Sequence, residues 1–567
     1  MKDEQKNFLL FALLAAAILF GWPYLAGTFF PTANPPATRI EQGKSEAIPA
    51  PSADPTADSP AAVRSRAVVL AETPRIRIDT PTLSGSINLR GPRIDDLILK
   101  KYDETVADNS APIRLLSPSG APDAYFAGFG WRDTGLQAPG PDTVWRATGD
   151  VLAPGKPVIL DAANAAGQRF RIELAVDDQY MFTIKQTVAN AGGQPVTVAP
   201  YALVNRSGVF HDKDSWTIHI GPMSVANGVA NYDTDFDELD EAPETFDSTG
   251  GWLGFTDKYW LTALIPDQGK DMAGQFRSGA NGAYQADYTV QPQQLAAGSA
   301  VTHTSRFFAG AKEVRAIDDY EANLGIAQFD KAIDWGWFRI IEKPIFYYLD
   351  WVFRMVNNFG LAIILLTLTV RLIMFPIAQK QFASMAGMRA VQPKLKALQE
   401  RYKDDKPRLQ QEMMKLYKDE KVNPLAGCLP MLLQIPIFYA LYKVLMLTIE
   451  MRHQPFILWI KDLSAPDPLT PINLFGLLPF TPPSFIAIGV FPILLGISMY
   501  FQFKLNPQPT DDVQKQVFAI MPWVLMFVMA PFAVGLQVYW ITTNVLTIAQ
   551  QQWLYSKHPA LRQAPAK

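Results

Sequence analysis

Six apolar runs in this chain are each about as long as a helix must be to cross a lipid bilayer. One lies near the N-terminus and five follow residue 357: 8–30, 358–376, 425–447, 484–503, 516–532 and 535–554. Because about 20 apolar helical residues span the hydrocarbon core, we predict a polytopic α-helical membrane protein with six spans. The last two runs are separated by very few residues, which predicts a tight hairpin over 516–554.

The first run is predicted to be an uncleaved anchor, residues 1–30, rather than a signal peptide. It is longer than a signal core and ends in Phe29, Phe30 and Pro31 instead of a small-residue cleavage site. Residues 31–74 are rich in Pro, Ala and Ser and bury too little apolar surface to fold. We therefore expect a flexible linker between the anchor and the next domain.

Residues 75–325 read as β-structure. Phe170, Ile172, Leu174 and Val176 alternate with polar residues, as they do in a strand with one buried face. Several such runs separated by Gly, Asn and Pro turns predict one large antiparallel sandwich. Residues 326–357 connect this domain to the second span and contain KPIFYYLDWVFRMVNN, which suits an amphipathic helix in the membrane interface. A helix packed on the sandwich is the alternative.

The distribution of basic residues predicts the orientation of the spans. The segment 377–424 carries eleven Lys and Arg residues, whereas 448–483 carries only Arg452 and Lys461. The positive-inside rule places the first segment in the cytoplasm and the second outside. We expect the β-domain outside as well, and we expect both termini, the loop 504–515 and the short basic tail 555–567 in the cytoplasm.

The basic segment 377–424 is also expected to fold as a helical hairpin. Met385, Met388 and Leu395 recur at helical spacing, and Met413 and Tyr417 continue a second apolar stripe after the turn KDDKPR. The simpler interpretation of most of its charges is a solvated helix face.

No pattern for catalysis, metal binding or a cofactor stands out. The single cysteine, Cys428, excludes a disulfide within the chain, and the five histidines lack metal-ligand spacing. The acidic run DTDFDELDEAPE has Glu238 where a calcium loop requires glycine, so an acidic surface loop is expected there. A net charge of −3 gives no reason to expect nucleic-acid binding.

Polar residues inside the predicted spans are the candidate functional residues. Arg371 lies four residues after Thr367 on one helix face, and the third run contains Gln434. The last run carries Tyr539, Trp540, Thr543, Asn544, Thr547, Gln550 and Gln551. Together they favour a water-filled groove between helices, because lipid strongly disfavours such groups. Taken one at a time, most of these residues would be explained by ordinary hydrogen bonds between helices. Arg371 is only about 8 Å from the cytoplasmic end and could instead extend its charge to the interface.

Three long stretches resemble the YidC family of membrane protein insertases. They are IDWGWFRIIEKPIFYYLDWVFRMVNNFGLAIILLTLTVRLIMFPIAQKQFASMAGMRAVQPKLKAL, QEMMKLYKDEKVNPLAGCLPMLLQIPIFYALYKVL and GLQVYWITTNVLTIAQQQWL. The resemblance extends to the anchor and the β-domain, as in Gram-negative members. It implies a bacterial inner-membrane insertase and chaperone, with a five-helix core, an extra anchor and a periplasmic β-supersandwich.

The resemblance also implies roles for residues and partners. Arg371 and Thr367 match the family's groove residues, and Tyr539 and Trp540 match an aromatic pair that meets the substrate helix. The implied partners are newly made membrane proteins, the Sec translocon with its accessory subunits, signal recognition particle and its receptor, ribosomes, and lipid. From the residues alone, two rivals stay open: a small-solute transporter, which would show inverted repeats, and a membrane-tethered carbohydrate-active enzyme.

Overall fold

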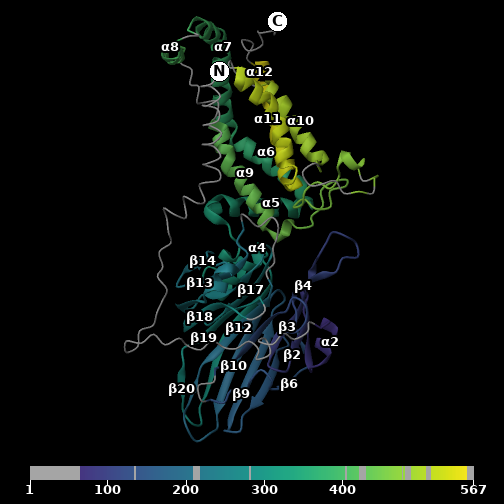
Figure 1. Ribbon diagram of the computed structural model, residues 1–567, viewed down its shortest axis with the longest axis vertical. Coiled ribbons are helices and arrows are strands. Elements are labelled where there is room, and N and C mark those ends of the chain that lie inside the picture. Colours follow the sequence, from purple (N-terminus) through teal and green to yellow (C-terminus); the bar gives the residue numbers. More distant parts are fainter. Residues whose placement is uncertain are drawn as a thin grey trace.

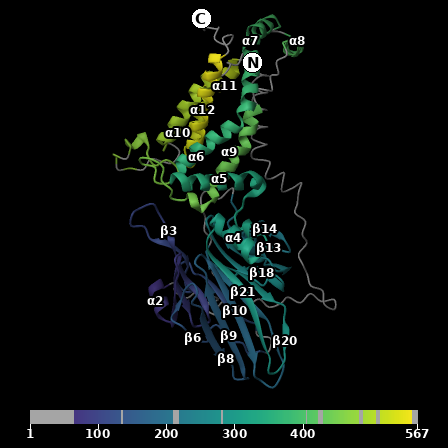
Figure 2. The same ribbon diagram turned by 180° about the vertical axis from the view of Figure 1, so that it is seen from behind.

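The computed structural model describes residues 64–132, 136–208, 218–279, 282–402, 405–420, 429–475, 477–478, 480, 487–505 and 512–557. A β-rich part and a helical part follow one another along the long axis of the molecule, with α5 lying across the boundary between them (Figures 1 and 2). The predicted anchor 1–30 and most of the predicted linker 31–74 lie outside the described residues, as does Cys428.

The described strands form two large sheets and one small one. The ten-stranded sheet has the order β15-β18-β19-β12-β5-β3-β2-β1-β7, with β4 paired to β3. Its strands are β15 Glu244–Thr249, β18 Asp271–Ser278, β19 Ala283–Val290, β12 Pro200–Ser207, β5 Tyr125–Trp131, β3 Arg93–Asp103, β2 Leu83–Asn88, β1 Arg75–Asp79, β7 Val151–Leu152 and β4 Pro112–Leu116. All pairs are antiparallel except β1 with β7.

The nine-stranded sheet has the order β14-β13-β16-β17-β21-β10-β9-β8-β6. Its strands are β14 Val229–Asn231, β13 Gly221–Ala226, β16 Trp252–Thr256, β17 Trp260–Ile265, β21 Ala300–Ala311, β10 Met181–Asn190, β9 Gln168–Val176, β8 Val158–Ala163 and β6 Arg146–Thr148. The small sheet pairs β11 Val196–Val198 with β20 Gln293–Leu295.

The inner faces of the two large sheets share one apolar core. On β9 the burial alternates, and Phe170, Ile172, Leu174 and Val176 all belong to this core. Phe307 on β21 packs against Phe129 on β5 from the facing sheet, with ring centroids 6.1 Å apart. The prediction of an all-β domain is thus confirmed, and its alternating residues are the ones that hold the two sheets together.

Two short helices depart from the sequence prediction. Helix α2, Arg66–Ala71, lies within the predicted flexible linker, and an ion pair joins Arg66 to Asp96 on β3. Helix α3, Phe236–Glu241, replaces the expected acidic loop, because Phe236 and Leu239 are buried. The backbone N–H of Asp235, which precedes α3, donates to Glu238 (3.4 Å), so these acids begin a helix. Within the described residues no cluster of His, Cys, Asp and Glu fits a metal ion.

The remaining helices follow the β-domain. They are α4 Val314–Leu324, α5 Arg339–Val356, α6 Phe359–Ile373, α7 Phe375–Arg401, α8 Lys406–Asp419, α9 Leu429–Leu447, α10 Val490–Leu505, α11 Asp512–Met529 and α12 Val534–Lys557, with short 3-10 turns η3 Phe329–Ala332, η4 Gly336–Phe338, η6 Ile449–Met451 and η7 Pro471–Asn473. In the ranges that the structure describes, no helix is both long and apolar enough to cross a bilayer alone. Helix α7 starts at Phe375 with Pro376 in its first turn, directly after α6.

Ion pairs fix the β-domain to α5. Asp350 accepts from Arg315 of α4 at 2.7 Å, and Lys343 donates to Asp318 and Asp330 at 2.9 Å each. The amphipathic helix that the sequence predicts in this segment therefore also packs against the β-domain, which was the stated alternative. One face of α5 still leaves Ile340, Trp351 and Met355 exposed.

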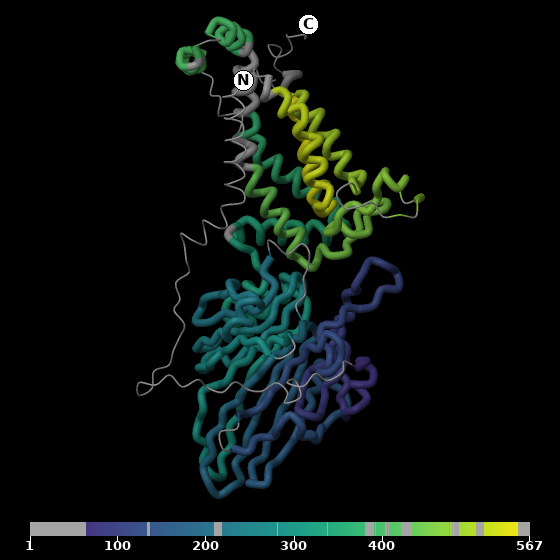
Figure 3. Tube along the Cα trace, viewed as in Figure 1, coloured from purple at the N-terminus to yellow at the C-terminus, as the bar shows by residue number. Residues whose placement is uncertain are grey.

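A second set of contacts comes from the turn after α9. The carboxylate of Glu450 accepts the backbone N–H of Val314 at 2.8 Å, and the Arg452 guanidinium lies over the rings of Tyr259 and Trp260. A cavity of about 370 Å³ lies between this turn, α5 and β3. Figure 3 shows, as a Cα trace, where the β-rich part and the helical part meet.

Candidate functional site

Arg371 connects α6 to α12. Its Nη2 donates to the backbone oxygen of Thr543 at 3.3 Å and to the hydroxyl of Thr547 at 2.7 Å. The Thr547 hydroxyl in turn donates to the Thr543 carbonyl at 2.6 Å. The arginine side chain is only partly exposed, and its contacts are directed to a neighbouring helix. This geometry matches a polar contact between helices rather than a charge that extends only to the membrane surface.

Thr367 lies one turn before Arg371 on α6 and is buried. Its hydroxyl donates to the carbonyl of Ile363 at 2.7 Å. The side chain therefore satisfies its own donor within the helix.

Gln434 and Tyr539 join α9 to α12. The Gln434 amide donates to the phenol oxygen of Tyr539, which is buried. The neighbouring Trp540 is partly exposed and packs edge-to-face on Phe438 of α9, with centroids 5.1 Å apart. The structure thus brings three predicted residues together at the contact between α9 and α12.

Asn544 lies on a different side of α12. Its amide donates to the hydroxyl of Ser498 on α10 at 2.9 Å, and both side chains are buried. Successive residues on a helix are rotated by about 100°, so Thr543 and Asn544 face different neighbours. Ser498 is absent from the sequence-based candidates because one serine in an apolar run carries little signal. Thr547, also a candidate from the sequence, is the side chain that accepts from Arg371.

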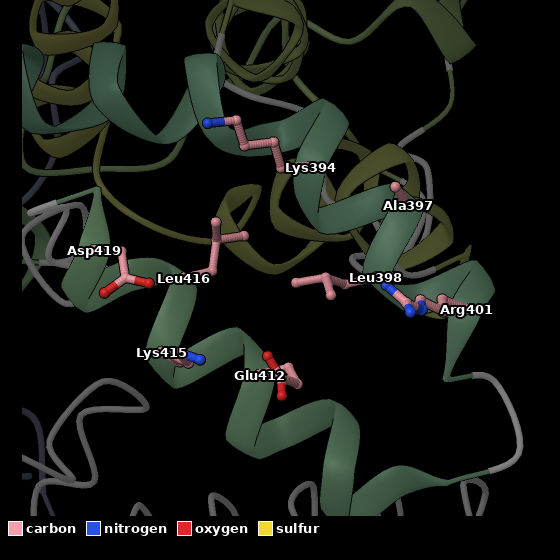
Figure 4. A pocket seen from close by; sticks show the side chains of 8 residues that line it. All are labelled: Lys394, Ala397, Leu398, Arg401, Glu412, Lys415, Leu416 and Asp419. Atoms are coloured by element: carbon pink, nitrogen blue, oxygen red, sulfur yellow. The ribbon is translucent and has the colours of Figure 1, made fainter.

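Helices α7 and α8 lie largely in the segment 377–424, where the sequence pattern predicts a helical hairpin, and they contact each other. Leu395 is buried, and Met413 and Tyr417 are partly buried, whereas the side chains of Met385 and Met388 lie outside the described residues. An ion pair between Lys394 and Glu420 joins the two helices. Leu398 and Leu416 point into a cavity of about 410 Å³, rimmed by charged side chains of both helices (Figure 4).

Charged side chains also lie where α9 ends next to α5. Lys443 of α9 is buried and donates to the backbone and carboxylate oxygens of Asp334 at 3.1 and 3.3 Å. Glu342 of α5 is buried nearby, and neither carboxylate oxygen has a hydrogen-bond partner among the described residues. Burial raises the pKa of Glu342 to about 7, while the charge of Lys443 acts in the opposite direction.

Two family models together match most of the chain, from residue 75 to residue 561. Residues 75–348 match the model described as YidC periplasmic domain, and residues 351–561 match the one described as 60Kd inner membrane protein. The boundary between the two matches falls within α5. The β-rich part and the helical part of the fold therefore each match a family model of their own.

Individual proteins show the same likeness over their full length. The membrane protein insertase YidC of Zymomonas mobilis is 51% identical over 98% of this chain and 96% of its own, and that of a Methylobacterium species is 48% identical over 91% and 85%. A crystal structure of an active YidC insertase with its first transmembrane domain resolved covers 84% of this chain and 92% of that one, at 18% identity and a TM-score of 0.37. Neither rival function is favoured by the full-length relatives. The chain belongs to the YidC family of membrane protein insertases.

Proposed function

We propose that this insertase works through a hydrated groove between α6, α9 and α12. The groove is open to the cytoplasm and to lipid, and it is closed toward the periplasm. The contact of Arg371 with Thr543 and Thr547 carries the proposal, because it holds a cation against a polar stripe of α12. The contact between Gln434 and Tyr539 supports a continuation of this polar lining onto α9.

The groove lowers the barrier that a polar tail meets when it crosses hydrocarbon. A short acidic tail of a substrate leaves bulk water in stages, and Arg371 offsets part of the desolvation cost of its carboxylates. The shortened apolar path is crossed with help from the membrane potential, worth about 2.3 kcal/mol per charge per 100 mV. The apolar segment of the substrate then moves past Tyr539 and Trp540 into lipid, where burial of its surface completes insertion.

The outer end of the groove is closed by the junction of α5 and α9. Lys443 is held by Asp334, and Glu342 is buried beside them. Buried charges of this kind are expensive to expose to hydrocarbon, so they favour one fixed packing of the two helices. We infer that this closure keeps ions from crossing while the groove is empty.

The membrane topology proposed with this mechanism has six spans, both termini in the cytoplasm and the β-domain in the periplasm. The charge asymmetry between 377–424 and 448–483 supports it. The hairpin α7–α8 then faces the cytoplasm, where it receives substrates from signal recognition particle or the ribosome. The same groove assists folding of membrane proteins, with the Sec translocon or without it.

Reconstituted insertion tests the groove. A single-span substrate with a short acidic outer tail is synthesised in the presence of liposomes holding the purified protein, and protease protection of the tail is scored. We expect Arg371→Glu to reduce protection and Arg371→Lys to retain most of it, because the lysine variant keeps the positive charge. Equal protection in all three proteins would contradict a role for the groove charge. A substrate with a neutral tail serves as the control and should depend less on residue 371.

A further inference from the structure

The segment after α9 carries apolar side chains that the protein does not cover. The exposed residues include Leu458, Leu474, Phe475 and Leu477, and both Leu458 and Leu477 keep more than four fifths of their surface (84% and 81%). Ile472, Leu478 and Phe480 are exposed too. The sequence-based topology places this segment, 448–483, in water outside the membrane, where a patch of this kind would be unfavourable.

The absence of charged residues distinguishes the later part of this segment from a loop that lies in water. No Asp, Glu, Lys, Arg or His occurs between Asp467 and Lys504. That uncharged stretch contains the predicted span 484–503 and continues before it over residues 468–483. The part before α10 therefore has the polarity of a membrane segment, although it is not a long helix.

Several backbone N–H groups in the described part of the segment are paired within it. The N–H groups of Leu474 and Leu477 donate to the carbonyls of Pro471 (3.0 Å) and Leu474 (3.3 Å), and that of Phe475 donates to Thr470 (3.0 Å). The N–H groups of Leu478 and Phe480 donate to Asn473 (3.0 Å) and Leu478 (2.9 Å). Irregular backbone is tolerated next to hydrocarbon only when its polar groups are paired within the protein.

The acidic side chains that precede these residues are directed inward. Asp467 is buried, accepts the Trp459 indole N–H at 3.0 Å and accepts the backbone N–H of Phe491 at 2.8 Å. Asp462 accepts from Ser464 at 2.7 Å. These two carboxylates are thus held within the protein, whereas Lys461 of the same segment is exposed.

The segment lies at about the level of α5 along the long axis of the molecule (Figures 1 and 2). In both views the yellow-green segment between α9 and α10 extends sideways from the helices, near the level of α5 (Figures 1 and 2). Helix α5 exposes Ile340, Trp351 and Met355. Exposed aromatic and long apolar side chains on an amphipathic helix are typical of the bilayer interface.

We propose that the exposed apolar side chains that follow α9 are immersed in the outer leaflet of the inner membrane and bind lipid acyl chains: Ile472, Leu474, Phe475, Leu477, Leu478 and Phe480. Together with α5 they give the insertase a lateral contact with lipid outside its spanning helices. The proposal rests on membrane residence, which family membership establishes, and is independent of the groove mechanism.

The single natural cysteine makes a direct test practicable. In a Cys428→Ser background, Leu477→Cys and Phe480→Cys carry an environment-sensitive fluorophore on the full-length protein in phosphatidylethanolamine and phosphatidylglycerol vesicles. Two controls carry the same label: Val229→Cys, an exposed apolar position on β14, and Lys461→Cys, an exposed charged position in the same segment.

We expect blue-shifted emission at positions 477 and 480, and loss of fluorescence when the vesicles contain lipids brominated on their acyl chains. The label at position 229 should show neither change, and that at 461 should respond to bromine less than that at 477. Water-like, unquenched emission at 477 and 480 would overturn the proposal. A blue shift that develops only after the Sec translocon is added would also overturn the proposal, because the residues would then be covered by a protein.

Discussion

Glu450 makes the contact between the β-domain and the helical part sensitive to pH. One carboxylate oxygen accepts the Val314 N–H at 2.8 Å, while the other is buried without a hydrogen-bond partner in the described part of the chain. Burial raises the pKa of Glu450 from its ordinary 4.5 to about 8, and the nearby carboxylates of Glu313 and Asp350 add to the shift.

The sign and size of the effect follow from proton linkage. Between these two pKa values the folded protein holds a proton that the unfolded chain has released, so stability falls as pH rises. The pKa values of the folded and unfolded states differ by about 3.5 units, and each unit corresponds to about 1.36 kcal/mol. The loss of folding stability is therefore at most about 5 kcal/mol, and it is complete above the folded pKa. The stabilisation is fully present below pH 4.5 and is lost as pH passes 8.

The substitution Glu450→Gln removes the titration and keeps an oxygen for the Val314 N–H. We expect the thermal midpoint of the wild-type protein in detergent to fall more steeply from pH 6 to pH 9 than that of the variant. Glu104→Gln, at an exposed position near the same junction, controls for a change of net charge and should follow the wild type. Parallel pH profiles for wild type and Glu450→Gln would refute the reasoning.

Three further predictions concern packing. The substitution Phe307→Ala should destabilise the β-domain by about 3–5 kcal/mol in urea titrations, since this ring is fully buried; a loss below 1 kcal/mol would contradict the assigned core. Gly254→Ala should lower the yield of folded protein, because an added Cβ would lie 1.9 Å from the Thr262 carbonyl oxygen, and wild-type yield would disprove that close approach. A double-mutant cycle of Ser498→Ala and Asn544→Leu should give a coupling of about 0.6 kcal/mol, and zero coupling would show that the bond between α10 and α12 is not formed.

The β-domain could be predicted from the sequence because its signal is local. Alternation at Phe170, Ile172 and Leu174 reflects which face of β9 is buried, and the structure confirms that face. The order of strands was not predictable, since β12 pairs with β5 and β19 across long separations. Helix α3 was missed because its acidic composition concealed two buried apolar residues, Phe236 and Leu239.

The candidate site, too, could be predicted from the sequence only in part. Helical spacing identified Arg371 and the polar stripe of α12, since a charge in an apolar run is conspicuous. Spacing could not show which neighbour each side chain meets. Asn544 contacts Ser498 of α10, whereas the carbonyl oxygen of Thr543 accepts from Arg371. Such assignments depend on how α12 is rotated in the bundle, and that rotation is set by tertiary packing.

The exposed apolar residues that follow α9 show a further limit of sequence patterns. The sequence shows that no charged residue lies among them, but Pro468 and Pro471 prevent the long apolar helix by which a membrane segment is usually recognised. The backbone hydrogen bonds between these residues are seen only in the structure.

Water in the groove is the central claim, and cysteine accessibility tests it most directly. In the Cys428→Ser background, Gln434→Cys places a thiol at a partly buried position next to Tyr539, while the adjacent Ile435→Cys lies on the exposed apolar side of α9. A thiol ionises and reacts in water but not in hydrocarbon. The account predicts that a membrane-impermeant maleimide added from the cytoplasmic side labels residue 434 much faster than residue 435. Equal labelling, or faster labelling at 435, would contradict a hydrated groove open to the cytoplasm.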